Sequence, residues 1–292
     1  MDAFWIMFTG SLVAISCALL GCFLLLRKMT MIGDAISHAV LPGIVLAYLV
    51  VHTKASFPML VGAALFGVLT TVMIELLRKN ARLQADAAIG ISFTWFFAIG
   101  IILISYFADS IDLDQDCVLY GEIAFVPLDT VAVGGFQIPH DTLTLSFNLL
   151  VVLTLILVGY KGLLITSFDG LYATALGIST AFWHYALMGA VSLTTVFSFE
   201  SVGAIMVVAF LVGPPSIAFL LTENLKKMLV FATLIGISAS IFGYFLAIWL
   251  DGAIAGAMAT VIGIEFIIAF LFAPRTGLLI KNKPLGPIRD LH

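Results

Sequence analysis

Long apolar runs, joined by short polar connections, make up most of the chain. A helix needs about 20 largely apolar residues to cross the hydrocarbon core of a bilayer, since each residue advances it by about 1.5 Å. About nine runs meet this requirement, at roughly 4–26, 33–51, 57–77, 87–107, 143–162, 181–198, 201–221, 228–250 and 252–273. The longest connection, 108–142, leaves open one further short helix inside 118–136. The pattern predicts an all-α integral membrane protein in which residues 1–292 form a single polytopic domain.

Charged residues give these spans an orientation. Lys and Arg are retained on the cytoplasmic side of a membrane, close to the ends of the spanning helices. With nine spans, all 13 Lys and Arg residues except Lys54 fall on one side. The N-terminus is therefore predicted outside and the C-terminus in the cytoplasm. The acidic 108–142 connection then lies outside. It either has a function, such as concentrating cations or docking a receptor, or it is an ordinary solvated loop.

Composition supports a lipid environment and excludes several classes of protein. Hydrophobic residues make up 62% of the chain and charged residues 10%, whereas a soluble domain has about 25% charged residues. A net charge of −4 gives no basic surface for a nucleic acid. The sequence has neither a G-x-x-x-x-G-K-[ST] phosphate loop nor an H-E-x-x-H motif. The chain is therefore not expected to hydrolyse ATP itself, and any ATPase that drives it is a separate subunit.

Two ionisable residues near the start of the second run are candidate metal ligands. An Asp in the middle of a bilayer costs about 2.5–3.5 kcal/mol, so it is usually retained for a function. Asp34 and His38 are four residues apart and therefore share one face of a helix. A carboxylate and an imidazole together suit Mn²⁺, Fe²⁺ or Zn²⁺. The alternative is a hydrogen-bonded pair that only fixes helix packing, and two ligands alone leave a metal site incomplete.

Further polar residues and helix interruptions lie elsewhere in the spans. Glu200 opens the seventh run and Glu265 lies deep in the ninth, so each is either an additional metal ligand or a packing residue. Proline removes a backbone donor and clashes with the preceding helical turn. Transporters use such interruptions to expose backbone carbonyls to a cavity. The predicted helix-breaking residues are Pro42, Gly43, Gly213, Pro214 and Pro215.

Five segments carry a resemblance to a known family. They are residues 31–43, 85–91, 119–123, 168–177 and 201–215. Together they resemble the membrane permease subunits of metal-ion ABC importers, the ABC-3 family of manganese, zinc and iron transporters. The resemblance runs along nearly the whole chain.

The resemblance implies an importer that is assembled from several subunits. Two permeases, either identical or paralogous, sit in the bacterial cell (inner) membrane on a pair of cytoplasmic ABC ATPases, and an extracytoplasmic receptor supplies the metal ion. The permease holds no permanent cofactor and has no catalytic residue, and its substrate is the divalent ion. Asp34 and His38 are then expected in the translocation path, where a second permease supplies another such pair.

The resemblance also assigns residues 163–178 to a cytoplasmic coupling segment, which docks in a groove of the ATPase. The charge distribution independently places this segment inside, directly after Lys161. The residues expected to take part in coupling are Phe168, Asp169, Ala173 and Gly177.

Two other classes of function stay open from the residues alone. A secondary cation transporter, driven by a proton or sodium gradient, would use Asp34, Glu200 and Glu265 as a relay. An intramembrane metalloenzyme would use Asp34 and His38 as ligands and would need a polarised water. The missing third ligand counts against the metalloenzyme.

Overall fold

The computed structural model describes residues 2–51, 56–107, 123–133 and 136–273, and this part of the chain is almost entirely helical. The longer helices are α1 (Asp2–Leu26), α3 (Leu41–Val51), α4 (Ser56–Asn80), α5 (Ala85–Tyr106), α7 (His140–Phe168), α9 (Thr180–Val202), α10 (Ala204–Leu221), α11 (Leu225–Leu250) and α12 (Ile254–Phe272). The shorter elements are α2 (Ile32–Ala39), the 3₁₀ helix η2 (Ile123–Leu128), the strands β1 (Thr130–Val133) and β2 (Phe136–Pro139), and α8 (Gly170–Ala175). The predicted all-α membrane architecture is confirmed.

Eight segments of the described chain are long and apolar enough to cross a membrane, with α2 and α3 together forming one of them. The predicted span that is not among these eight is the sixth, 181–198, which corresponds to the 23-residue helix α9. Its buried Ser and Thr side chains and His184 lower its hydropathy. The number of spans and their sidedness therefore stay predictions.

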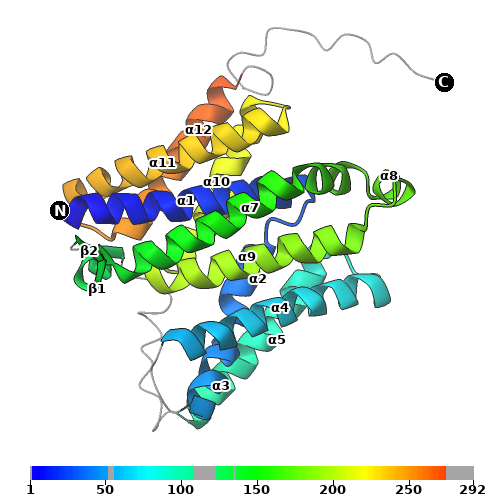
Figure 1. Cartoon of the computed structure of the whole chain (residues 1–292), viewed down its shortest axis with the longest axis horizontal. Coiled ribbons are helices and arrows are strands. Elements are labelled where there is room, and N and C mark those ends of the chain that lie inside the picture. Colours follow the sequence, from blue (N-terminus) through cyan, green and yellow to red (C-terminus); the bar gives the residue numbers. More distant parts are fainter. Residues whose placement is uncertain (1, 52–55, 108–122, 134–135, 274–292) are drawn as a thin grey trace.

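Helix α1 lies among α7, α9, α10 and α11 (Figure 1). It packs against all four, and residues such as Val13, Cys17 and Leu20 are fully buried. Helices α3, α4 and α5 pack on one another on the other side of α9, which α4 contacts directly. In Figure 1, α8 lies at the opposite end of the bundle from the N-terminus and the β1–β2 hairpin. The outer helices expose many large apolar side chains, as expected of a surface that faces lipid.

The described part of the connection before α7 begins with a short 3₁₀ helix, which a hairpin follows. Residues 118–122 lie outside the described part of the chain, and the only helix described in 123–136 is the six-residue η2, which contains Pro127. Strands β1 and β2 then pair antiparallel, with Val131 opposite Ile138. Pro127 and the β-branched residues of β1 explain the preference for a 3₁₀ turn and a hairpin over an α-helix.

The interruption of the second span occurs slightly before its predicted position. Helix α2 ends at Ala39, and Pro42 and Gly43 lie inside the first turn of α3, where proline is tolerated. Because Pro42 has no N–H, it cannot bond the carbonyl of His38 as an ordinary helical residue would. Gly43 instead serves helix packing, since a Cβ on it would clash with the carbonyl of Gly62 on α4, and the reverse also holds.

The predicted break at Gly213, Pro214 and Pro215 is not present, because α10 is helical through these residues to Leu221. Both prolines are buried, and the hydroxyl of Ser216 donates to the carbonyl of Val212 at 2.6 Å. Neighbouring helices and such side chains commonly stabilise proline in membrane helices. The sharp turn in this region lies at Gly203, whose φ of 78° separates α9 from α10 and favours glycine.

Candidate metal path and coupling region

The Asp34–His38 pair lies on α2, as its spacing predicted. Asp34 Oδ1 and His38 Nε2 are 3.6 Å apart, and each side chain is about one-third exposed. The imidazole packs edge-on against Phe97 of α5, with a centroid distance of 5.5 Å, and lies close to Phe93. The nearby Ser37 hydroxyl donates to the carbonyl of Gly33 at 3.0 Å. The His38 ring therefore packs against α5, and both side chains remain accessible.

Asp34 faces a pocket of about 550 Å³ between the start of α2 and the start of α5. A second carboxylate, Asp86, lines the same pocket, together with Thr30 and Met31. Asp86 belongs to the 85–91 segment that carried part of the family resemblance, although sequence reasoning gave it no role. The pocket thus brings together two carboxylates that are far apart in the sequence.

The other predicted ligands do not join this site among the described side chains. The Oε1 atom of Glu265 accepts a 2.7 Å hydrogen bond from Ser238, so this carboxylate ties α12 to α11. Glu200 lies in the last turn of α9, but its side chain is outside the described part of the structure. No group of three or more His, Cys, Asp or Glu residues that could hold a metal occurs among the described residues. Among the side chains that the structure describes, one copy of the chain therefore offers the Asp34–His38 pair and, on the same pocket as Asp34, Asp86.

The predicted coupling segment forms a short helix between two long ones. Helix α7 ends at Phe168, and Asp169 caps α8 by accepting a 2.9 Å hydrogen bond from the Tyr172 N–H. Leu171 is 88% exposed, and Phe168 and Tyr172 are also exposed. Of the four residues expected to take part in coupling, Ala173 is fully buried and therefore packs within the permease.

Gly177 ends α8 in a conformation that requires its lack of a side chain. Its φ is +75°. The Gly177 N–H donates to the Thr174 carbonyl at 3.0 Å, and the Ile178 N–H donates to the Ala173 carbonyl at 2.9 Å. These two bonds form a Schellman motif, in which glycine is favoured at the left-handed position. The Ser179 hydroxyl then caps α9 through the Phe182 N–H.

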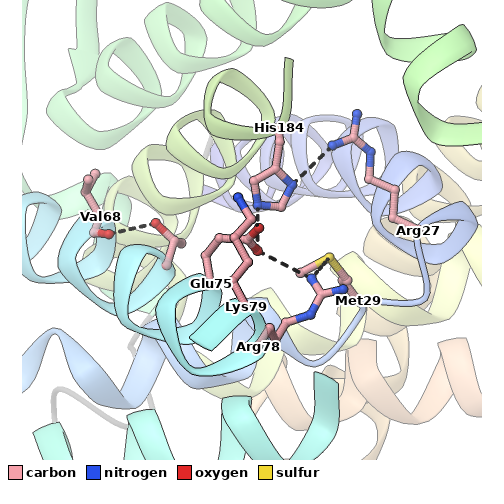
Figure 2. A network of polar contacts seen from close by, with 8 residues as sticks. Arg27, Met29, Val68, Glu75, Arg78, Lys79 and His184 are labelled. Carbon is pink, nitrogen blue, oxygen red and sulfur yellow. Dashed lines mark hydrogen bonds and ion pairs between the residues drawn. The ribbon is translucent and has the colours of Figure 1, made fainter. Parts of the chain in front are cut away.

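A polar network lies where the connection after α1 meets α4 and α9, and it was not predicted from the sequence (Figure 2). Its centre is Glu75 on α4, whose side chain is 14% exposed. The Lys79 Nζ lies 3.0 Å from Glu75 Oε1, and Arg78 Nη1 and His184 Nε2 each lie 3.5 Å from Oε2. We call this cluster the Glu75 network, and its members are Arg27, Met29, Glu75, Arg78, Lys79, Thr166, Ser167 and His184.

Arg27, which follows α1, joins this network to the helices on both sides of α8. It donates to Thr166 Oγ1 at 2.9 Å and to Ser167 Oγ at 3.0 Å, both at the end of α7. Its Nη1 lies 3.5 Å from His184 Nδ1 on α9. Because an arginine only donates, this contact assigns the acceptor role to Nδ1 and the ring proton of a neutral His184 to Nε2, which lies 3.5 Å from Glu75 Oε2. Burial lowers the pKa of Arg27 to about 10, so the side chain remains cationic at neutral pH.

Comparison with known proteins identifies the family. The sequence profile of the ABC 3 transport family matches residues 3–273, which is most of the chain. The chain belongs to the ABC 3 transport family. The expectation drawn from the five sequence segments is therefore confirmed.

Relatives of this ABC 3 protein match it along nearly its full length. The manganese transport system membrane protein MntD of Bacillus subtilis is 48% identical over 279 residues, which cover 95% of this chain and 94% of MntD. The zinc transport system membrane protein TroD of Treponema pallidum is 43% identical over 267 residues, covering 91% of this chain and 73% of TroD. A chain in the structure of PsaBC from Streptococcus pneumoniae in complex with Fab is 34% identical, with a TM-score of 0.75 and coverage of 92% and 91%.

For this ABC 3 protein, sequence reasoning identified the local features and missed the contacts between helices. Asp34, His38, Asp169 and Gly177 occupy the local positions that their spacing or motif implied. Glu75 went unnoticed because it stands beside Arg78 and Lys79, so it reads as part of a solvated helix end. The only sequence signal was a carboxylate within the third apolar run.

Proposed function

We propose that this chain is the permease subunit of an ATP-driven importer of divalent metal ions of the manganese and zinc class. The observation that carries the proposal is the accessible Asp34–His38 pair at a pocket that also holds Asp86, in a chain of the ABC 3 transport family. Two of its full-length relatives are manganese and zinc transport proteins. Carboxylate and imidazole are ligands that suit these ions.

The metal path in this proposal is shared between two permease chains. Each chain contributes one carboxylate and one imidazole, because the described residues of a single chain hold no complete ligand set. The partial exposure of Asp34 and His38 leaves room for the second copy to approach. Such a site binds weakly, because a conduction site must also release its ion.

Release of the ion proceeds through the pocket between α2 and α5. Asp34 belongs both to the ligand pair and to the pocket wall. Asp86 offers a second carboxylate farther along the same pocket, at the start of α5. A cation that leaves the pair therefore moves toward another negative charge, which lowers the barrier to exit.

The energy for transport comes from a separate ATPase dimer, which docks on α8. The exposed apolar side chains Phe168, Leu171 and Tyr172 form the docking face. Asp169 and Gly177 hold α8 at a fixed angle to its neighbours through the cap and the Schellman motif. The predicted topology places α8 in the cytoplasm and the N-terminus outside, where an extracytoplasmic receptor supplies the ion.

Metal accumulation tests this function. Metal-starved cells expressing the chain with its ATPase and receptor are compared by elemental analysis for Mn, Zn and Fe, at matched membrane levels of each variant. We expect one metal to accumulate, and Asp34→Asn and His38→Ala to abolish the accumulation. Ser37→Ala is the matched control on the same helix, because its hydroxyl bonds only the carbonyl of Gly33.

Three results contradict parts of the proposal. Wild-type cells that accumulate no metal, with the complex shown to be assembled, refute the importer. Uptake that persists when the ATPase subunit is catalytically inactive indicates a gradient-driven transporter instead. Normal accumulation by Asp34→Asn and His38→Ala leaves the importer in place but removes the proposed site.

A further inference from the structure

The connection between α1 and α2 forms a wall between two pockets. The Asp34 pocket is lined on this side by Lys28, Thr30 and Met31. A second pocket of about 440 Å³ is lined by Arg27, Lys28 and Met29, together with the Glu75 network. The same short connection therefore faces the metal path on one side and the Glu75 network on the other.

The Glu75 network holds both helices that flank α8. Thr166 and Ser167 lie in the last turn of α7, directly before α8, and His184 lies near the start of α9, directly after it. All three contact the guanidinium of Arg27, at 2.9, 3.0 and 3.5 Å. A displacement of α8 that moves the ends of α7 and α9 is therefore transmitted to Arg27 through three separate contacts.

The network closes on the same connection through α4. His184 Nε2 lies 3.5 Å from Glu75 Oε2, and Arg78 Nη1 lies 3.5 Å from the same oxygen. Arg78 Nη1 also lies 3.4 Å from the Sδ atom of Met29, which is buried. The contacts thus form a ring from Arg27 to His184 on α9, then to Glu75 and Arg78 on α4, and back to Met29 of the connection (Figure 2). The bonds from Arg27 to Thr166 and Ser167 add the end of α7 to this ring.

The connection is stiff enough to transmit this motion to α2. Lys28 adopts a φ of +56°, which costs about 1–2 kcal/mol for a residue with a side chain. The bonds from the Lys28 N–H to the Leu25 carbonyl and from the Met29 N–H to the Leu24 carbonyl, both 3.0 Å, keep it in this turn. The Ile32 N–H then bonds the Met29 carbonyl at 3.3 Å, so the turn continues directly into α2.

The charges in the second pocket argue against a second metal site. Four cationic side chains, those of Arg27, Lys28, Arg78 and Lys79, line it with the single carboxylate Glu75. A divalent cation would be repelled there, whereas the Asp34 pocket has two carboxylates and one lysine. The Glu75 network is therefore suited to positioning helices and not to conducting the ion.

We propose that Arg27 is the positioning residue that transmits movement of α8 to α2 and so opens and closes the Asp34 pocket. It acts through its contacts with Thr166, Ser167 and His184, and the ring of contacts is completed by Glu75 and Arg78. This inference rests on the proposed function, in which α8 receives the motion of the ATPase. It adds a defined route between that motion and the metal ligands. The route depends on the fork geometry of the guanidinium, which a lysine cannot reproduce.

The test measures metal uptake and ATP hydrolysis together in proteoliposomes that contain the full complex with its receptor. Arg27→Lys keeps the positive charge but loses the fork, and Glu75→Gln loses the charge that closes the ring. We expect both variants to hydrolyse ATP while the number of ions moved per ATP falls at least about tenfold, since hydrogen bonds to charged groups are the stronger ones. Lys227→Gln is the control, because this exposed lysine, in the first turn of α11, lies on the same predicted side of the membrane but outside the Glu75 network.

A second readout separates coupling from simple stability. Met31 lines the Asp34 pocket and is 50% exposed. In a protein whose three native cysteines are replaced, the rate at which the thiol of Met31→Cys is modified reports how accessible this pocket is. We expect this rate to change between the nucleotide-free and ATP-trapped complexes, and the change to be lost when Arg27→Lys is added. If Arg27→Lys fails to assemble, Thr166→Val with Ser167→Ala removes two of the same contacts from the α7 side and takes its place.

The outcomes distinguish this inference from the function on which it rests. If the unmodified complex takes up no metal, the proposed function is overturned. The second case is an unmodified complex that transports metal normally. If Arg27→Lys and Glu75→Gln then keep the wild-type number of ions moved per ATP and the nucleotide-dependent modification rate at position 31, only the role of the Glu75 network is overturned.

Discussion

The conformation of Gly177 gives a quantitative prediction about ATPase docking. Its φ of +75° places it in the left-handed region, where an L-residue costs about 1–2 kcal/mol. A Cβ at this position meets no atom within 4 Å, so the cost of Gly177→Ala comes from the backbone alone. A free-energy difference of this size changes an equilibrium about 5- to 30-fold. We expect Gly177→Ala to weaken association with the ATPase by this factor.

The chain offers a matched control at the other end of the same helix. Gly170 is the first residue of α8, its φ lies outside the left-handed region, and the nearest atom to an added Cβ is Thr180 Cγ2 at 4.0 Å. Gly170→Ala adds the same methyl group and should bind the ATPase as well as wild type or better, since alanine favours helix. Asparagine tolerates the left-handed region better than alanine, so Gly177→Asn should fall between wild type and Gly177→Ala.

The assay is a titration of the permease, in lipid nanodiscs, with its purified ATPase, followed by measurement of metal uptake per ATP for the same variants. Equal ATPase affinity for Gly177→Ala and Gly170→Ala would refute the reasoning. It would mean that α8 docks without its Schellman motif.

Two further predictions concern packing inside the bundle. Gly62→Val should lower the thermal midpoint of the purified protein, because a side chain there collides with the carbonyl of Gly43. The expected loss in the free energy of unfolding is about 1–3 kcal/mol. Gly263→Ala, which adds a methyl group in open space, should leave the midpoint unchanged. Thr194→Val should lower the free energy of unfolding by about 1–3 kcal/mol, because it removes the 3.2 Å hydrogen bond to the buried Asn148 Oδ1. Adding Asn148→Leu should recover part of this loss. A double variant that is less stable than Thr194→Val alone would contradict the prediction.

The sequence determined most of the secondary structure of this protein for a simple physical reason. In a lipid environment each backbone N–H and C=O must be satisfied within its own segment, so a long apolar run has to be a helix. The second run shows where this reasoning reaches its limit. Proline identified an interruption near residue 42, but the exact end of α2 at Ala39 depended on packing. At Pro214 and Pro215, which are both buried among neighbouring helices, α10 stays helical and the expected break does not occur.

Local spacing also determined the parts of the functional region that lie within one helix or one turn. Asp34 and His38 share a face because residues four apart do so in any α-helix. The cap of α8 by Asp169 and the left-handed Gly177 are likewise local, and the family resemblance pointed to both residues.

Only the tertiary structure decided which distant residues meet. From the sequence, Arg27 and Arg78 indicated only which side of the membrane is cytoplasmic. In the structure both belong to the Glu75 network with His184. Asp86 and Asp34 line one pocket because α5 packs on α2. Periodicity records which residues share a face of one helix, but the partner of that face depends on how all the helices pack together. The contacts that join the ends of α7 and α9 to the wall of the Asp34 pocket are therefore properties of the fold.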